Sequence, residues 1–246
     1  MKWAIPERSK IRRLPKFLWP AAVWARQLLH VPRFQVDGLS TTHITSFTET
    51  PRFQRAYARA VKAGRMDFNI PFRVHQALWC SRVAQRVKGD FVELGTGRGF
   101  IMSALLEDGL ARPLHLFDTF LSSWPDQSGK QSGEACPYYA DSFEETKANF
   151  AEWSNVHFHP GDVCETLPKA GLSSVSFAHI DMNHPDPEEF GVRFLWPLMP
   201  SGAVILFDDY AYANAWSQHR RINQLAEELG FDILTTPGGQ GIVIKS

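Results

Sequence analysis

The chain has 246 residues, which is enough for one α/β domain with additional elements but short for two full domains. Acidic and basic residues balance at 26 each, so the formal net charge of zero gives no reason to expect a nucleic-acid partner. The three cysteines, Cys80, Cys136 and Cys164, form no Cys-x-x-Cys pair, which argues against a disulfide framework or zinc knuckle and predicts a cytoplasmic protein.

The first 70 residues are predicted to form an N-terminal arm and a helical cap. A basic stretch surrounds a short apolar patch at 17–24, which is far shorter than the ~20 residues that a membrane span needs. We expect the arm to pack on the rest of the chain or on a second subunit of a homo-oligomer; a lid or a membrane-surface contact is the alternative. Helical patterns follow at 53–63 and 74–87.

From residue 90 onward, short apolar runs alternate with helical patterns, the order typical of a doubly wound parallel sheet. The last two runs, 231–235 and 242–245, lie too close together for a crossover helix and therefore predict an antiparallel hairpin. The expected domain, 71–246, is a mostly parallel seven-stranded sheet that ends in this hairpin, with a helical N-terminal extension. Its other predicted strands are 91–95, 113–118, 156–159, 175–180 and 203–207, and its predicted helices are 101–110, 142–150, 187–198 and 216–229.

Three glycines at alternate positions lie between the first strand of this domain and the helix that follows it. Such a turn needs backbone dihedrals that other residues avoid, and side chains there would keep a ligand away from the backbone. A dinucleotide fingerprint, Gly-x-Gly-x-x-Gly, would need a glycine where this chain has Phe100. The pattern present, Glu-x-Gly-x-Gly-x-Gly, resembles the first motif of class I methyltransferases, which implies S-adenosylmethionine as the cofactor. The predicted cofactor-binding residues of this turn are Glu93, Gly95, Thr96, Gly97 and Gly99.

Two further segments are candidates for binding the same ligand. Asp118, at the carboxyl end of the second strand, is placed to accept hydrogen bonds from both ribose hydroxyls of a nucleoside. Gly161 and Asp162 follow the third strand; in methyltransferases this loop borders the adenine, and an acid there can accept from the exocyclic amine. The alternatives are that Asp118 only caps a loop and that 161–162 form an ordinary turn.

Acidic residues end two neighbouring strands of the predicted sheet. Asp181 follows the strand at 175–180, and Asp208 and Asp209 follow the strand at 203–207. Adjacent strands are about 4.8 Å apart, so these carboxylates are expected to meet at the edge of the sheet where ligands bind. No run of Lys or Arg lies nearby in the sequence, so the acids would repel one another unless a hard cation binds. The sequence therefore predicts a Mg²⁺ site formed by the three carboxylates.

His184 lies three residues beyond Asp181 and is the predicted general base, because a histidine that titrates near neutral pH can take the proton of a hydroxyl. The metal would bind that hydroxyl and lower its pKa, so Asp181 is counted among the catalytic residues as well. A loop histidine bonded to the backbone is the alternative for His184, and His219 is expected to be structural. Loop aromatics that could line an acceptor pocket are Trp124, Tyr138, Tyr139 and Tyr210.

Several segments together resemble the macrocin O-methyltransferase family, which comprises bacterial enzymes that methylate sugar hydroxyls on antibiotics. The most specific part is Ile-Asp at 180–181, followed one strand later by Asp-Asp-Tyr at 208–210. The resemblance implies Mg²⁺ ligands at Asp181, Asp208 and Asp209 and a base at Asn183 or His184. Family members with an acid at the place of Asn183 differ from this chain, which shifts the expected base to His184. The matching segments, within 88–246, are 91–95, 116–120, 161–162, 166–168, 179–181 and 207–210.

The predicted function is an S-adenosylmethionine-dependent, Mg²⁺-assisted O-methyltransferase that acts on a hydroxyl of a small molecule, such as a sugar or natural product. A metal-independent methyltransferase is one alternative, with Asp208 and Asp209 as a helix cap and a buried hydrogen-bond acceptor. A nicotinamide-dependent oxidoreductase is disfavoured by Phe100 and by the antiparallel ending of the sheet. A catalytically silent cofactor-binding module is disfavoured by the intact acids.

Overall fold

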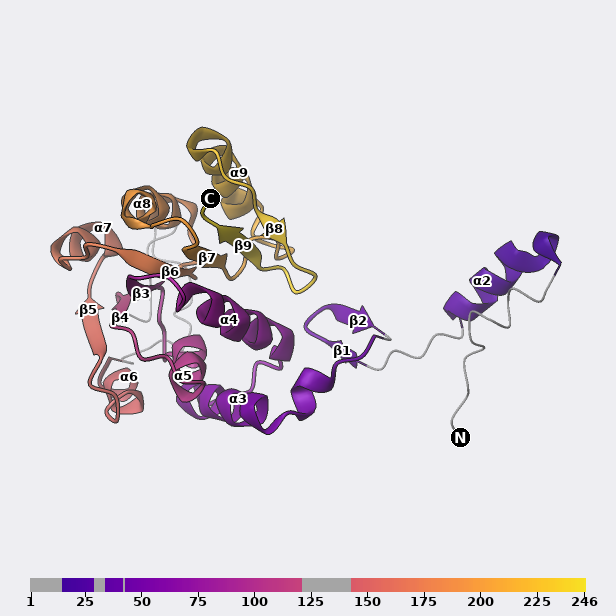
Figure 1. The fold of residues 1–246 in the computed structure, drawn as a ribbon, viewed down its shortest axis with the longest axis horizontal. Helices are drawn as coiled ribbons and strands as arrows, with labels where there is room; N and C mark the ends of the chain where they lie inside the picture. Colours follow the sequence, from indigo (N-terminus) through magenta and orange to yellow (C-terminus); the bar gives the residue numbers. More distant parts are fainter. Residues whose placement is uncertain (1–14, 29–33, 42, 121–142) are drawn as a thin grey trace, which may run out of the picture. The chain divides into compact units, whose positions relative to one another are not determined.

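The chain divides into two structural units, residues 1–46 and residues 47–246. A computed structural model describes residues 15–28, 34–41, 43–120 and 143–246, and Figure 1 shows their helices and strands. The division lies before the boundary near residue 70 that the sequence predicted, because the helices after residue 50 pack into the core of the second unit. The helical cap thus belongs to the larger unit.

The first unit contains a helical segment and a hairpin. The two residues between the strands of the hairpin, Asp37 and Gly38, have φ values of 51° and 68°. A two-residue type I′ turn requires positive φ at both positions, and Asp-Gly is among the sequences that favour it. The elements of this unit are η1 (Lys16–Leu18), α2 (Trp19–Leu28), β1 (Phe34–Val36) and β2 (Leu39–Thr41).

Seven strands of the second unit form a single sheet. They are β3 (Asp90–Leu94), β4 (Leu114–Asp118), β5 (Val156–Pro160), β6 (Val175–Ile180), β7 (Val204–Phe207), β8 (Leu234–Thr235) and β9 (Gly241–Ile244). Their order is β5-β4-β3-β6-β7-β9-β8, and all neighbours are parallel except β9, which runs antiparallel to both β7 and β8. This confirms the predicted doubly wound, mostly parallel sheet with an antiparallel ending. The central strands β6 and β7 are buried along their whole length, as strands covered on both faces should be.

Helices cover both faces of this sheet (Figure 1). They are η2 (Ser46–Glu49), α3 (Pro51–Gly64), α4 (Pro71–Ala84), α5 (Phe100–Glu107), α6 (Phe143–Asn149), α7 (Val163–Thr166), η3 (Leu167–Lys169), α8 (Pro185–Leu195), η4 (Trp196–Leu198) and α9 (Trp216–Leu229). α3, α4 and α5 lie on one face, and α7, α8 and α9 on the other. Because side chains of a strand alternate between faces, Phe91 of β3 enters the core beneath α3–α5, whereas Val92 enters the core beneath α7–α9.

Helix boundaries follow local capping signals. The side chain of Thr50 accepts a backbone N–H from the first turn of α3. α8 begins two residues earlier than predicted, at Pro185, because His184 caps it. Gly230, with a φ of 72°, ends α9 as predicted. The sequence did not predict α7, a single helical turn after β5.

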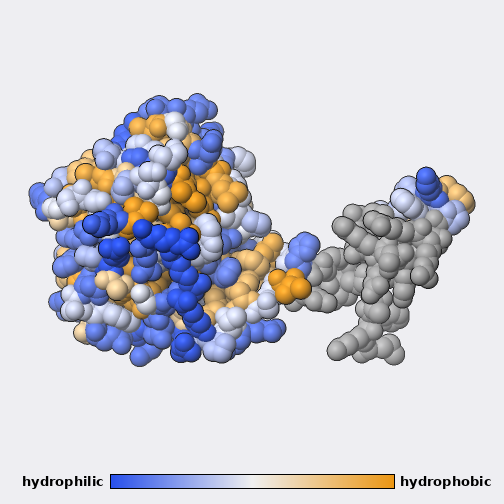
Figure 2. All heavy atoms as spheres, viewed as in Figure 1, coloured by the Kyte–Doolittle hydropathy of each residue, from blue (hydrophilic) through white to orange (hydrophobic). Residues whose placement is uncertain are grey.

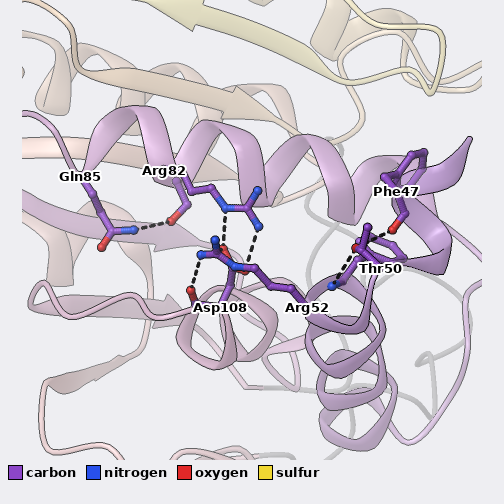
Figure 3. Close-up of polar contacts among 8 residues, drawn as sticks. Phe47, Thr50, Arg52, Arg82, Gln85 and Asp108 are labelled. Carbon is purple, nitrogen blue, oxygen red and sulfur yellow. Dashed lines mark hydrogen bonds and ion pairs between the residues drawn. The ribbon is translucent and has the colours of Figure 1, made fainter.

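Asp108 connects three helices on one face of the sheet (Figure 3). It directly follows α5, and its side chain is only 4% exposed. Both carboxylate oxygens accept hydrogen bonds from Arg82 of α4 at 2.8 Å, and Arg52 of α3 donates to the same carboxylate. A bidentate pair between a guanidinium and a carboxylate fixes the relative orientation of the two side chains better than a single hydrogen bond does. Asp108 therefore fixes α3 and α4 against the end of α5.

We expect Asp108→Asn to lower the free energy of unfolding by about 2 kcal/mol, because two guanidinium groups lose their charged partner. Partial exposure of both arginines keeps the loss below that of a fully buried ion pair. Urea denaturation measures the change. Glu144→Gln, which disrupts an exposed pair with Lys147, is the matched control and should cost less than about 0.5 kcal/mol. Equal losses in the two variants would contradict the connecting role of Asp108.

Three histidines form a stacked row where β4 meets β5. The ring of His115 lies 4.9 Å from that of His157 and 5.3 Å from that of His159. Nδ1 of His115 is 3.0 Å from Nε2 of His159. Burial, and then the charge of neighbouring histidines, lowers the pKa of both His115 and His159 to about 4. Both rings are therefore neutral at pH 7.

Acidification should destabilise the fold through this row. The two histidines have a pKa of about 6.5 in the unfolded chain, so between that pH and about pH 4 the unfolded state binds more protons. Their stabilising contribution is complete above pH 6.5 and is lost as the pH falls. The double variant His115→Asn, His159→Gln lacks these titrating groups. Its free energy of unfolding should therefore fall less than that of wild type when the pH is lowered from about 7 to about 5. Urea denaturation at the two pH values tests this, and parallel pH profiles would count against it.

Figure 2 shows hydrophilic and hydrophobic side chains interspersed on one face of the second unit. Exposed large apolar side chains of this unit include Trp79 of α4 and Leu234 of β8. In the first unit, Phe17 and Trp24 are exposed at 79% and 63%; the homo-oligomer expected from this region stays a prediction. Within the described ranges, no helix combines the length and apolar character that crossing a membrane requires.

Candidate active site

The glycine-rich turn connects β3 to α5 at the carboxyl edge of the sheet. Gly95, Gly97 and Gly99 have φ values of 92°, 53° and 83°, which residues with a side chain rarely adopt. A Cβ on Gly95 would lie 1.9 Å from the carbonyl oxygen of Asp181, and a Cβ on Gly99 would lie 2.3 Å from the ring of Phe150. The sequence explained these glycines by the approach of a ligand; at Gly95 and Gly99, packing within the protein already requires them.

Two other residues of the turn contribute to its packing. Thr96 is buried, and its hydroxyl donates to the carbonyl oxygen of Phe117 at 3.4 Å. Phe100, at the position where a dinucleotide turn needs its third glycine, is buried and packs edge-on against Tyr57 and Phe68. The turn is therefore built around an aromatic side chain that a dinucleotide fingerprint does not accommodate.

Asp118, the predicted ribose-binding acid, lies at the end of β4 beside the turn. Its Oδ2 accepts the backbone N–H of Gly97 at 2.7 Å, and its Oδ1 accepts that of Phe120 at 2.6 Å. Asp118 thus caps the adjoining loop, which matches the alternative to the ribose-binding role; its contact with a ribose stays a prediction. Each carboxylate oxygen can accept a further hydrogen bond.

The 161–162 segment makes an ordinary turn and helix cap. The N–H of Gly161 donates to the carbonyl oxygen of Asp118 at 2.9 Å, which brings this segment beside the end of β4. The side chain of Asp162 accepts the N–H of Cys164 at 2.8 Å and caps α7. The structure thus places both residues near Asp118; their contact with adenine stays a prediction.

Glu93 and His179 form a buried pair beneath the turn. They lie opposite each other on β3 and β6, with Nδ1 of His179 2.9 Å from Oε1 of Glu93. Nε2 of His179 lies 3.6 Å from Oδ1 of Asp208. Burial would lower the pKa of His179, but the interactions with Asp208 and Glu93 outweigh burial and raise it to about 10. A buried imidazolium therefore links the turn to the acids of β7.

Several buried polar atoms around Asp208 have no hydrogen-bond partner among the described residues. They are Oε2 of Glu93, Nε2 of His179 and Oε1 of Gln240. Gln240 is fully buried, and its Nε2 donates to Oδ1 of Asp208 at 2.7 Å. Unsatisfied buried polar atoms are rare in folded proteins and are expected where a ligand, an ion or ordered water completes the hydrogen bonding. Their concentration at one place makes this edge a candidate binding site.

The structure brings together the three acids that the sequence proposed as metal ligands. Asp181, Asp208 and Asp209 each offer a carboxylate oxygen within 4.8 Å of the others. They meet because β6 and β7 are neighbours in register, with Ile180 beside Phe207. Clustered carboxylate oxygens are the donors that hard divalent cations prefer, so this donor set fits Mg²⁺ or a similar ion.

The inference that these acids lack a basic neighbour is wrong. Arg73 of α4 lies 135 residues before Asp208 in the sequence. Its Nη1 is 2.9 Å from Oδ2 of Asp208 and 2.8 Å from Oδ1 of Asp209, and its side chain is 7% exposed. Only the tertiary fold brings this arginine to the acids, and no local pattern in α4 distinguishes it from Arg82, the other arginine of the helix.

The three acids differ in their electrostatic surroundings. Burial raises the pKa of Asp181 well above its ordinary value, and the negative charge of Asp208 adds to this effect. Burial and Asp208 also raise the pKa of Asp209, although Arg73 opposes them. At Asp208 itself, the nearby His179 ring and the charge of Arg73 outweigh burial and hold the pKa below its usual range. Among the described residues, Asp181 forms no ion pair.

His184 is the N-cap of α8. Its Nδ1 accepts the backbone N–H of Asp186 at 3.3 Å, which matches the alternative of a loop histidine bonded to the backbone. This bond orients the ring and leaves Nε2 without a hydrogen bond among the described residues. Asn183, with a φ of 56°, donates its side-chain amide to Oδ1 of Asp181 at 3.3 Å.

Glu188, which the sequence analysis did not single out, holds the loop that carries these residues. It is buried on α8 and accepts hydrogen bonds from the side chain of Gln218 at 3.0 Å and from the backbone N–H groups of Met182 and Asn183. Burial raises its pKa to about 7, although these donors oppose the shift. The buried carboxyl group of Glu188 on α8 thus holds the backbone of the loop after β6 in place.

The structure contradicts one of the four aromatic residues that were expected to line an acceptor pocket. Tyr210 is buried, and its hydroxyl donates to Asn223 of α9 at 2.7 Å, so its placement in the crevice is wrong. His219 lies 3.0 Å from the carbonyl oxygen of Tyr210, in keeping with its expected structural role. Tyr212, two residues further on, is 51% exposed and has the guanidinium of Arg73 over its ring. The other three candidates, Trp124, Tyr138 and Tyr139, lie outside the described residues.

Residues 92–210, which contain the glycine-rich turn and all three acids, match a family model described as a methyltransferase domain. The chain carries a methyltransferase domain. The predicted enzyme class is therefore confirmed, whereas the macrocin family in particular stays a prediction. Every predicted site residue lies within the matched part of this methyltransferase, and Arg73 lies before it. No match was found among curated protein sequences.

Solved methyltransferase structures share the fold. The O-methyltransferase NovP is 20% identical, with 80% of this chain and 90% of that chain covered and a TM-score of 0.62. The calicheamicin methyltransferase CalS11 is 17% identical, with 79% and 93% covered and a TM-score of 0.56. The O-methyltransferase TomG from Streptomyces achromogenes, involved in tomaymycin synthesis and solved in complex with S-adenosylmethionine, is 16% identical, with 81% and 94% covered and a TM-score of 0.50. At these identities the similarity concerns the fold.

Proposed function

We propose that this methyltransferase transfers the methyl group of S-adenosylmethionine to a hydroxyl oxygen of a small molecule, such as a sugar or another natural product, with a divalent cation at the acid cluster. The observation that carries the proposal is that three carboxylates converge at strand ends beside a glycine-rich turn, where a Cβ on Gly95 would meet the backbone of Asp181. Similar folds in the O-methyltransferases NovP and TomG support the reaction class.

The cofactor is proposed to bind across the turn and the neighbouring strand ends. Glycines carry no side chain to keep a ligand from the backbone of the turn, and Oε2 of Glu93 is a buried acceptor that a ligand donor could satisfy. The cofactor carries a positive sulfonium, which the acidic surroundings favour. The residues proposed to hold it are Glu93, Gly95, Thr96, Gly97, Gly99, Asp118, Gly161 and Asp162.

In the transfer, the acceptor oxygen bonds to the methyl carbon while the carbon–sulfur bond breaks and its electron pair stays on sulfur. The hydroxyl proton must leave, and Nε2 of His184 is the proposed acceptor because Nδ1 is held by the N–H of Asp186. Asp181, Asp208 and Asp209 would hold a cation that supplies Lewis-acid activation of the hydroxyl. Glu188 keeps the loop of His184 in place.

A metal-independent methyltransferase is the second candidate, and Arg73 is the observation that favours it. Arg73 already pairs with Asp208 and Asp209 and offsets part of their negative charge, so Asp208 can act as a buried hydrogen-bond acceptor without a cation. Asp181 favours the metal-assisted reaction, because it lies part-buried beside these acids and forms no ion pair among the described residues. The two candidates share the cofactor and differ in the requirement for metal.

Two measurements test the proposal. Calorimetry with S-adenosylhomocysteine should show saturable binding, and NAD should give no heat. Folded protein that does not bind S-adenosylhomocysteine would refute the methyltransferase reaction proposed here. Methyl transfer from labelled S-adenosylmethionine to a panel of sugars and glycosylated natural products then identifies the acceptor class. Activity that survives thorough EDTA treatment would rule out the metal-assisted reaction in favour of the second candidate.

A further inference from the structure

The guanidinium of Arg73 and a divalent cation have the same partners in this site. A single nitrogen, Nη1, bridges one oxygen of Asp208 and one of Asp209 at 2.9 Å and 2.8 Å. Asp208 is engaged further, because its other oxygen accepts Nε2 of Gln240. A cation bound by these carboxylates therefore has to approach a buried positive charge that already occupies them.

Burial makes this conflict strong. The side chains of Arg73 and Asp208 are 7% and 11% exposed, so little water screens their charges. Without a metal, Arg73 relieves the repulsion between Asp208 and Asp209, which are adjacent in the chain. With a metal present, the same positive charge repels the ion. Arg73 should thus stabilise the metal-free protein and weaken its affinity for metal.

Tyr212 is a second partner that the guanidinium already contacts. Cζ of Arg73 lies 5.5 Å from the centroid of the Tyr212 ring, which is 51% exposed. Arginine over an aromatic ring gains a cation–π interaction. A guanidinium released by the carboxylates can therefore remain within the site, at the more exposed ring, without becoming an unpaired buried charge.

We propose that Arg73 is a built-in counter-cation that exchanges with a divalent metal ion at Asp208 and Asp209. In the metal-free protein it pairs both carboxylates; on metal binding it gives up Asp209 and stays beside Tyr212. Arg73 is then a positioning residue that sets the affinity for metal. This inference rests on the proposed metal-assisted function and adds to it the residue that regulates metal uptake.

Arg73→Met tests the exchange, because it removes the charge and keeps an unbranched side chain of similar length. In calorimetric titrations with Mn²⁺, the variant should bind about tenfold tighter than wild type or better. In EDTA it should unfold at a lower temperature than wild type, and Mn²⁺ should restore more stability to it. Arg82→Met, on the same helix but paired with Asp108, is the matched control; it should lower stability and leave Mn²⁺ affinity unchanged. Equal or weaker Mn²⁺ binding by Arg73→Met overturns the proposal.

A second measurement uses wild-type protein, so it does not depend on the folding of Arg73→Met. The ¹⁵N guanidinium signals of Arg73, assigned with Arg73→Lys, should shift as diamagnetic Mg²⁺ saturates the site; unchanged signals at saturation overturn the exchange. Parallel titration with S-adenosylhomocysteine separates a failure of the proposed methyltransferase function from a failure of the Arg73 exchange. If folded wild-type protein does not bind S-adenosylhomocysteine, the proposed function is rejected. Cofactor binding without any Mn²⁺ binding rejects the metal and its exchange, and normal binding of both with no effect of Arg73 rejects the exchange alone.

Discussion

Asp181→Asn should lower kcat for methyl transfer by about 10³-fold, because it removes about 4 kcal/mol of metal-dependent stabilisation of the transition state. Among the described residues Asp181 forms no ion pair, and its carboxylate lies within 4.8 Å of those of Asp208 and Asp209, so a bound cation would relieve their repulsion. Binding of S-adenosylhomocysteine should persist, since Asn keeps the shape of the side chain. Initial rates with saturating S-adenosylmethionine, together with calorimetry, measure the two effects.

Stability separates this effect from damage to the fold. Burial and the charge of Asp208 raise the pKa of Asp181, so its ionised form is costly in the metal-free protein. Asp181→Asn should therefore unfold in EDTA at the same temperature as wild type or higher. Asp186→Asn, an exposed acid at the start of α8, is the matched control and should keep its rate within about twofold. A rate for Asp181→Asn above a tenth of wild type would speak against a metal ligand there.

Gly95→Ala should destabilise the protein by about 3–5 kcal/mol and abolish cofactor binding. Backbone strain at a φ of 92° accounts for part of the loss. The larger part comes from the Cβ, which would lie 1.9 Å from the carbonyl oxygen of Asp181 and force the two strand ends apart. Urea denaturation gives the stability, and calorimetry with S-adenosylhomocysteine gives the binding.

Gly109→Ala is a close control for the backbone contribution. Gly109 has a φ of 101°, and no atom lies within 4 Å of a Cβ built on it. Its replacement should cost only about 1–2 kcal/mol and leave binding intact. If both alanine variants lose the same stability, the contact with Asp181 is not the cause.

The sheet could be predicted from the sequence because its signals are local. Short apolar runs such as that at 203–207 identify buried strands, and the short connection around 236–240 allows an antiparallel ending and no crossover. Helix starts were less accurate: α8 begins at Pro185 because the side chain of His184 caps it, and histidine is not among the common N-caps. α7 is a single turn, too short to show a hydrophobic period.

The site was predictable only where it follows from the sheet. Asp181 and Asp208 end neighbouring parallel strands, so their approach follows from strand order. Arg73 and Gln240 come from α4 and from the turn before β9, and their roles depend on packing that no local pattern encodes. Tyr210 shows the opposite error: its place after a strand end suggested the crevice, but its ring enters the core and its hydroxyl bonds to α9.

Because the turn at Gly95 packs directly against the backbone of Asp181, neither segment can move without displacing the other. Evolutionary or laboratory remodelling of either loop would disturb its neighbour, so acceptor preference is more easily altered elsewhere. The segment after β7, where Tyr212 and Trp216 are exposed at 51% and 67%, offers side chains that can vary without moving that contact. Libraries that seek new acceptors should therefore diversify this segment and leave both loops unchanged.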